Sequence, residues 1–205
     1  MEIAFQAART LIPTIDQLLD EGGTTRQELA AIAVTTGPGS FTGVRIGVTT
    51  AKTVAYALGL PAVGINTLDA IARATNSGAS EGAAGGTGGK RLWVAMDAQR
   101  GDLFVAEYPL PWLHHQQWED PTSLLSRSSW LAGLQPGDVV TGPAELKAEL
   151  SPEVEWLELP SPQEVAAGVG RLAWKFLEWG RGISPLELVP HYYRASAAEE
   201  KRRLG

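Results

Sequence analysis

Thr36-Gly37-Pro38-Gly39-Ser40-Phe41-Thr42-Gly43-Val44-Arg45-Ile46-Gly47 is the stretch of sequence that decides the fold of this chain. It follows a predicted strand over residues 30–35 and opens a helical pattern over residues 43–58. A strand, a glycine-rich turn and a helix N-terminus together form many phosphate sites. However, no lysine follows Gly43 as a Walker A loop requires, and Thr42 occupies the third glycine position of the dinucleotide pattern. We therefore expect these glycines to serve a tight turn and close packing.

Small residues recur at every fourth position of the predicted helix, at Gly43, Gly47, Ala51 and Ala55. Such a stripe carries almost no side chain and lets another helix come close. Arg45 and Lys52 interrupt the apolar run, so this helix is not a membrane span. A second set can face the sheet: Val44, Val48 and Leu58. Two packable faces indicate that the helix lies between its own core and a partner.

Composition narrows the possible functions. The chain has 205 residues and no cysteine, which suits one or two domains and excludes disulfides and thiolate metal sites. No leader or apolar run of spanning length is evident, so we expect a cytoplasmic protein. The net charge of −6 argues against nucleic-acid binding as the chain's own task, and we interpret Lys201-Arg202-Arg203 as a solvated end.

The first part of the chain alternates helices and strands, which predicts an α/β layer. We expect a helix at 11–20 that ends at Gly22-Gly23, with Pro13 in its first turn or at a kink. The other elements are predicted at 30–35, 43–58, 61–65 and 67–75. The Gly-rich residues 76–89 are predicted to be a mobile loop, not a phosphate loop, because a strand follows them.

The second part begins with a predicted hairpin of strands at 92–96 and 103–106, with its turn near Arg100-Gly101. A loop through Pro121, a short helix and a strand at 138–141 follow. Ser161-Pro162-Gln163-Glu164 is a capping box that starts a helix closed by Gly180. All seven tryptophans lie after residue 90, and we interpret them as core and loop anchors.

Catalytic constellations are nearly absent. The three histidines are His114, His115 and His191, and they do not form the i, i+4 pair that binds zinc on a helix. Gly39-Ser40-Phe41 lacks the G-x-S-x-G frame of a serine nucleophile. We interpret Asp97, which precedes Arg100 at the hairpin turn, as a carboxylate that stabilises the turn.

Several motifs together resemble the TsaB (YeaZ) family of bacterial subunits of the threonylcarbamoyladenosine tRNA modification machinery. The strongest are the stretch quoted first, extended to Ala51-Lys52, and the segments Leu60–Ile65 and Thr67–Ala70. Weaker similarities cover much of the remaining chain: Asp97–Phe104, Val140–Pro143 and Pro190–Arg194. The resemblance implies an α/β fold of the duplicated actin/hexokinase/Hsp70-like (ASKHA, ribonuclease H-like) class.

Family chains begin with a strand carrying an A-x-D-T-S-like segment and a hairpin, whereas this chain begins close to the first helix. We expect the first N-terminal strands, roughly 25–30 residues, to be missing. The remaining sheet would then have an uncapped edge. The expected division is a Gcp-like (peptidase M22-like) α/β subdomain at 1–77, a Gly-rich loop at 78–90 and a C-terminal α/β subdomain at 91–205.

The resemblance implies a non-catalytic partner subunit that binds and activates TsaD, which transfers threonylcarbamoyl to adenosine 37 of tRNA. It also implies contact with the ATPase TsaE, a possible homodimer, tRNA contact only through the complex, and no membrane. ATP and metal would belong to the partner subunits, with no cofactor, metal or catalytic residue of the chain's own. The histidine pair that holds metal in the catalytic subunit has no match here. The implied partner-binding residues are Gly43, Gly47, Ala51, Ala55, Ile15 and Leu19.

Two rival interpretations remain. One is a metal-dependent glycoprotease-like hydrolase that acts alone, which the missing ligand pair disfavours. The other is a relative of sugar or acetate kinases, which the missing phosphate-binding hairpin disfavours.

Overall fold

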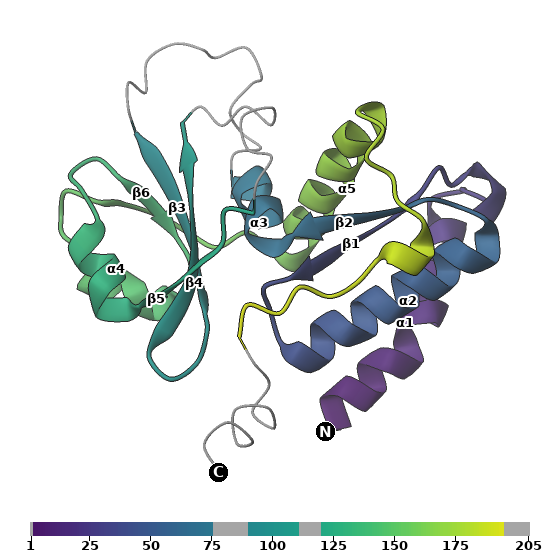
Figure 1. Ribbon diagram of the computed structural model, residues 1–205, viewed down its shortest axis with the longest axis horizontal. Helices are drawn as coiled ribbons and strands as arrows, with labels where there is room; N and C mark the ends of the chain where they lie inside the picture. The colour runs from purple at the N-terminus through teal and green to yellow at the C-terminus, as the bar shows by residue number, and fades with distance from the viewer. Residues whose placement is uncertain (1, 76–89, 111–119, 195–205) are drawn as a thin grey trace. The chain divides into compact units, whose positions relative to one another are not determined.

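A computed structural model describes residues 2–75, 90–110 and 120–194 (Figure 1). The chain packs as two compact units: unit 1 is Met1–Ile65 with Ala173–Gly205, and unit 2 is Asn66–Leu172. The division expected from sequence, at 1–77, 78–90 and 91–205, stays a prediction. The Gly-rich segment on which it depends lies almost entirely outside the described residues.

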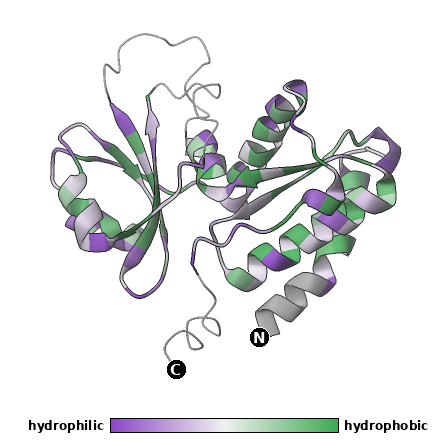
Figure 2. Cartoon of the chain, viewed as in Figure 1, coloured by the Kyte–Doolittle hydropathy of each residue, from purple (hydrophilic) through white to green (hydrophobic). Residues whose placement is uncertain are grey.

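Besides the last residues of helix α5 (Pro162–Glu178), the described part of unit 1 contains a two-stranded sheet, two long helices and short 3-10 turns. In chain order these elements are α1 (Glu2–Glu21), η1 (Arg26–Glu28), β1 (Ile32–Gly37), α2 (Phe41–Leu58), β2 (Ala62–Asn66) and η3 (Pro185–Glu187). Helix α2 packs on β1, and one side of the helix shares a core with β2 and the C-terminal segment. Figure 2 shows hydrophobic and hydrophilic residues alternating along α2, as expected of a helix with one face on a core.

Three expectations for unit 1 need correction. The first helix covers Glu2–Glu21 instead of residues 11–20, so Pro13 lies inside it and not in its first turn. The residues before Pro13 mostly have good helix propensity, so the helix begins well before residue 11, where the spacing of apolar residues had placed its start. Strand β1 is Ile32–Gly37, two residues later than expected. Helix α2 begins at Phe41 because the Ser40 hydroxyl accepts a hydrogen bond from the Gly43 amide at 3.4 Å.

Unit 2 is built on a five-stranded sheet with the order β5-β4-β3-β6-β7. The strands are β3 (Arg91–Asp97), β4 (Asp102–Pro109), β5 (Ser123–Ser126), β6 (Val139–Thr141) and β7 (Glu155–Leu157). The predicted hairpin is confirmed, with Ala95 opposite Val105 in an antiparallel register. Strands β6 and β7 continue the sheet in parallel. Sequence analysis missed β5 and β7, which are four and three residues long and lie at the sheet edges.

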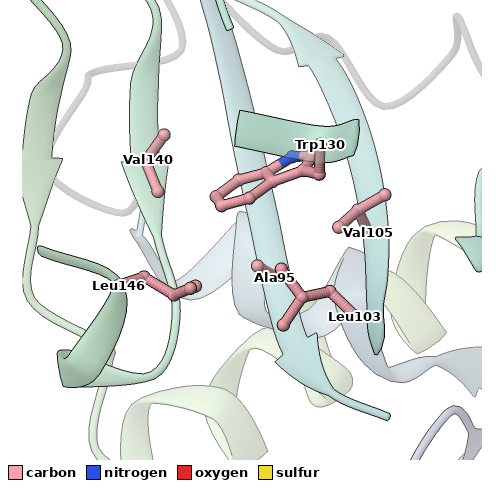
Figure 3. Packing of buried hydrophobic residues seen from close by; sticks show 6 residues of the cluster. All are labelled: Ala95, Leu103, Val105, Trp130, Val140 and Leu146. Atoms are coloured by element: carbon pink, nitrogen blue, oxygen red, sulfur yellow. The ribbon is translucent and has the colours of Figure 1, made fainter. Parts of the chain in front are cut away.

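One face of this sheet carries a core centred on Trp130, which is 2% exposed (Figure 3). Trp130 comes from the short helix α4 (Arg127–Gly133) and packs with Ala95, Val105 and Val140 of three different strands. Leu146 reaches the same cluster from the 3-10 turn η2 (Ala144–Glu149). The indole N–H of Trp130 is buried without a hydrogen-bond acceptor. The ring is therefore held by packing alone.

An ion pair between half-buried Arg91 and buried Asp138 joins the amino-terminal ends of β3 and β6. The Arg91 guanidinium donates from Nε and Nη2 to the carboxylate of Asp138, at 2.9 and 2.6 Å. Hydrogen bonds to Asp138 raise the pKa of Arg91. The same carboxylate accepts from the Trp93 indole at 3.2 Å and from the Gln135 amide at 2.8 Å. Asp138 therefore has the partners that a nearly inaccessible charge needs.

The remaining helices are α3 (Thr67–Thr75), whose predicted bounds are confirmed, and α5 (Pro162–Glu178). The capping box is confirmed as well. The Ser161 hydroxyl accepts from the Glu164 amide at 3.3 Å, and the Glu164 carboxylate accepts from Ser161. These bonds lower the pKa of Glu164. At Gly168 a Cβ would lie 2.6 Å from the Ala70 carbonyl oxygen, so the glycine lets α5 approach α3.

Candidate protein–protein interface

The glycine-rich turn after β1 packs against the chain's own C-terminal segment. The His191 amide donates to the Thr36 carbonyl at 2.8 Å. A Cβ at Gly37 would lie only 2.5 Å from the His191 carbonyl oxygen, and φ at Gly37 is +130°. Only glycine fits this position without a shift of backbone. The prediction that these glycines serve close packing is confirmed at Gly37.

Two aromatic rings and one guanidinium extend this contact. Phe41 stacks on Tyr192 with ring centroids 4.6 Å apart, and Arg45 lies 4.4 Å above the Phe41 ring. Arg45 Nε also donates to the Tyr192 hydroxyl at 3.3 Å. Further along α2, Lys52 Nζ donates to the carbonyl oxygens of Leu186 and Leu188. The glycine-rich motif that begins at Thr36 therefore contacts the Pro190–Arg194 motif, although about 150 residues of sequence separate Arg45 from Tyr192.

The four small residues of the α2 stripe differ in how far they are buried. Ala55 is 0% exposed and Ala51 is also buried, and both pack in a core with Val48, Ala62 and Leu188. Gly47 is half-buried, and Gly43 is exposed near the start of the helix. The Ala55 side chain thus packs against the chain itself, which leaves no surface of it for a partner. The partner-binding role expected of the stripe stays a prediction.

The other two predicted residues, Ile15 and Leu19 of α1, lie with Gly47 and Ala51 on one groove. The groove has a volume of about 480 Å³ and lies between α1, β1 and α2. Its lining is mainly apolar and also includes Leu11, Ile12, Leu29, Ile32, Ala33, Val34, Val54, Ala57 and Leu58. The structure therefore brings four of the six predicted residues together. Ala55 lies in the core, and Gly43 is not among the residues that line the groove.

Large apolar side chains of both helices are also open to solvent. Leu18 of α1 is 61% exposed, and Tyr56 of α2 is 68% exposed. Ile12 is 42% exposed although it also lines the groove. The two helices contact each other, but Tyr56 lies beside Ile183, Ser184 and Pro185 of the C-terminal segment and does not line the groove between the helices. Ile12 and Leu18 are therefore the exposed large apolar residues of α1, near the apolar groove.

Sequence analysis did not assign a role to Asp69 of α3, a half-buried carboxylate in unit 2. Its Oδ1 accepts a hydrogen bond from the hydroxyl of Tyr108 at 2.7 Å, and Tyr108 is itself fully buried. Burial raises the pKa of Asp69 from 3.8 to about 6, against the lowering effect of the Tyr108 hydrogen bond. Nearby Asp120 raises it further. A single aspartate in a helix carries no sequence signal of burial, so only the structure could find it.

The remaining site interpretations have mixed outcomes. The Asp97 carboxylate accepts from the Gln99 amide at 2.8 Å, which confirms its role in the hairpin turn. Trp130 is a core anchor as expected, but Trp174 and Trp179 are 59% and 37% exposed, so the expectation is wrong for those two. Trp174 lies in α5 and Trp179 directly follows the helix, and the residue type alone does not show which tryptophan faces solvent.

His114 and His115 lie outside the described residues, whereas His191 is exposed. Within the described ranges, no group of three or more histidine, cysteine, aspartate or glutamate side chains is placed to hold a metal ion. None of the helices in these ranges is both long and apolar enough to span a membrane.

Comparison with known proteins places this fold and its motifs. A family model described as "TsaD: tRNA N6-adenosine threonylcarbamoyltransferase" matches residues 3–109, more than half of the chain. The chain therefore belongs to this family of Gcp-like α/β proteins. Two solved structures from Pseudomonas aeruginosa, one of them entitled "YeaZ", share the fold with a TM-score of 0.66. The other, described as similar to peptidase YEAZ, is 25% identical and aligns over 91% of this chain and 83% of its own. The expected α/β fold class is confirmed.

Within the family, the chain is similar to proteins named TsaB. The "tRNA threonylcarbamoyladenosine biosynthesis protein TsaB" of Escherichia coli is 31% identical over 175 residues, which cover 84% of this chain and 62% of that protein. The protein of the same name from Bacillus subtilis is 35% identical over 47% of this chain and 38% of its own length. The chain thus spans less than two thirds of these relatives. The TsaB (YeaZ) resemblance predicted from the motifs is confirmed.

Proposed function

We propose that this chain is a non-catalytic subunit in the biosynthesis of threonylcarbamoyladenosine in tRNA, where it binds and activates a TsaD-type transferase. Relatives named for this pathway support the assignment, with 31% identity over most of the chain. The match to the transferase family model adds a physical reason for pairing. Related folds present related surfaces, and such surfaces readily form pseudo-symmetric dimers.

Helices α1 and α2 carry the proposed binding surface, and the observations that support it are the exposure of Ile12 and Leu18 on α1 and the apolar groove between the two helices. Side chains of this size at a helix pair supply the apolar anchors that interfaces need. Gly43 leaves the start of α2 without a side chain, so a partner helix could come close there. The groove residues Ile15, Leu19 and Gly47 would set the spacing of the two helices under this surface.

The other functions assigned to the complex follow from the same proposal. ATP and metal belong to the partner subunits, and tRNA is reached only through the complex. Contact with TsaE and self-association are further proposed interactions of the chain. Because tRNA modification takes place in the cytoplasm, we infer that the chain functions there.

Affinity measurement with the TsaD-type protein of the same organism tests the interface. We expect Ile12→Glu combined with Leu18→Glu to weaken binding about 30-fold or more, the scale of lost interface anchors. Gly47→Leu should also abolish association while the chain stays folded. The matched control is Leu124→Glu combined with Leu125→Glu, which adds the same two charges at exposed leucines of β5 in unit 2. Parent-like affinity of both altered forms would show that α1 and α2 are not the interface.

Activity measurement tests the subunit role. The chain should increase threonylcarbamoyl transfer by the TsaD-type protein and should show neither transfer nor peptidase activity alone, with or without added zinc or iron. A metal-dependent peptidase activity of the purified chain would overturn the proposal in favour of the hydrolase.

A further inference from the structure

The start of helix α3 holds the chain segment that leads into strand β5. Asn66 directly precedes the helix, and its side-chain oxygen accepts from the Leu68 amide at 2.8 Å, as an N-cap residue does. The Asn66 side-chain nitrogen donates to the Asp120 carboxylate at 3.0 Å and to the Thr122 hydroxyl at 2.7 Å. Residues 120–122 come directly before β5, so one side chain joins the start of α3 to the start of this strand.

The same arrangement brings two carboxylates to the N-terminus of α3. Asp69 is the third residue of the helix, and side chains at the N-cap and at this third position lie beside each other. Asp120, which is bound to the N-cap side chain, therefore lies next to Asp69, and the repulsion between the two charges acts on Asp69. A helix N-terminus favours a nearby negative charge, but two close carboxylates hold one proton more tightly than a single carboxylate does.

Helix α3 packs against three other elements, which limit the groups that can face Asp69. Strand β4 presents the Tyr108 hydroxyl, which donates to Asp69 Oδ1 at 2.7 Å. Strand β3 places the apolar Leu92 opposite Tyr108, and α5 approaches α3 at Gly168, which has no side chain. Arg73, one turn further along α3, stays charged at every pH considered below. A proton taken up near neutral pH therefore changes the carboxylate pair and not these neighbours.

We propose that Asp69 and Asp120 form a proton-sensitive catch, which holds segment 120–122 and the start of β5 firmly when the pair binds one proton and loosely when both carboxylates are charged. Strand β5 depends on such an attachment, because it is four residues long, lies at the edge of its sheet and has every residue exposed. The catch lies in unit 2 and does not depend on the proposed interface of α1 and α2.

Linkage between proton binding and conformation sets the direction of the effect. Release of segment 120–122 takes Asp120 away from Asp69 and admits water, and both changes lower the pKa of Asp69 from its folded value of about 6. The closed state therefore binds the proton more tightly than the open state, so a bound proton favours the closed state. The catch closes as pH falls through about 6 and loosens as pH rises above it.

Amide exchange measured by NMR at pH 5 and pH 7 tests the catch in the full chain. The reporter is the Thr122 amide, which donates to the Asp120 carboxylate at 3.0 Å. After correction for the intrinsic effect of pH on exchange, its protection should be about tenfold higher at pH 5 than at pH 7. The Gln99 amide is the internal control, because the Asp97 carboxylate holds it in a similar turn at the β3–β4 hairpin. Its protection should show no such difference.

Asp120→Asn is the decisive variant, because asparagine keeps an oxygen that accepts from Asn66 and Thr122 but removes the charge. Protection at Thr122 should then be equally high at both pH values, and the pKa of Asp69, followed by the shift of its carboxyl carbon, should fall. Asp69→Asn should also remove the pH difference, whereas the matched control Asp97→Asn should leave it unchanged. The same pH difference at Thr122 in the parent and in Asp120→Asn, or an unaltered pKa of Asp69 in this variant, would overturn the proposal.

Discussion

The strands β1 and β3 are similarly apolar in sequence but differ in their surroundings. Strand β3 lies third of five in its sheet, and its inner residues Val94 and Ala95 are fully buried. Among the described residues, strand β1 pairs with β2 alone, and its first four residues, Ile32–Thr35, are only half-buried. The number of neighbours that a strand has therefore decides how much of its apolar surface is buried. The same difference leaves a filled core in unit 2 and an open groove in unit 1.

Removal of the Trp130 side chain from the filled core of unit 2 should have the largest effect on stability. Trp130→Ala leaves a cavity in the core of unit 2, and we expect a loss of about 3–5 kcal/mol in the free energy of unfolding. Trp130→Phe should cost clearly less, because the lost indole N–H has no acceptor. Urea denaturation followed by circular dichroism measures both, and amide exchange assigns the loss to unit 2. A cost below about 1 kcal/mol for the alanine variant would mean that this core is not tightly packed.

The half-buried carboxylate of Asp69 should make the stability of unit 2 depend on pH. The pKa of Asp69 is about 6 in the folded protein, whereas its ordinary value, which applies to the unfolded chain, is 3.8. The folded state therefore binds the proton more tightly than the unfolded state. Stability is therefore highest below pH 3.8 for this group and falls as pH rises to about 6, by about 3 kcal/mol in total. Asp69→Asn should remove this dependence and be more stable than the parent at pH 7. The free energy of unfolding of both forms is measured at pH 5 and pH 7. An equal change between the two pH values in the parent and in Asp69→Asn would contradict this account.

Leucine at two positions of α2 should separate the filled and open sides of unit 1. Ala55→Leu inserts three carbons into a buried site against Val48 and Leu188, so we expect a loss of about 1–3 kcal/mol. At Gly47 a Cβ meets only Val34 at 3.5 Å, an ordinary contact, and leucine also has the better helix propensity. Gly47→Leu should therefore be neutral or stabilising in thermal melts. Equal destabilisation by both substitutions would show that the groove is closed in solution.

The smallest effect is expected at Tyr192, where the C-terminal segment lies on the surface of unit 1. Tyr192→Ala removes the stack on Phe41 and the bond from Arg45, and we expect a loss of about 1 kcal/mol. Tyr192→Phe keeps the stack and should cost less than half as much. Amide exchange at His191 reports the local release. No change there in the alanine variant would mean that the bond to Thr36 alone holds the segment.

Local sequence signals were sufficient to predict the elements whose ends are marked by a turn, a capping box or a C-cap glycine. The hairpin has its Arg100-Gly101 turn, α5 has the Ser161 capping box, and α2 ends before Gly59 in a left-handed conformation. The predicted bounds were wrong where no turn or capping residue marks the end of an element, as at the start of α1. Short edge strands such as β5 were missed. Short strands have too few residues for alternation to show.

The sequence by itself determined the family, the α/β class and the close-packing role of the first motif, because those depend on residue types at fixed spacing. Tertiary structure alone decided where that motif packs. Tyr192 lies on Phe41 and Arg45 through contacts across most of the chain, and no local pattern encodes them. It also decided that Ala55 is buried while Gly47 faces a groove, although both belong to one stripe. A side chain's spacing fixes its direction on a helix, whereas burial depends on which other elements arrive there.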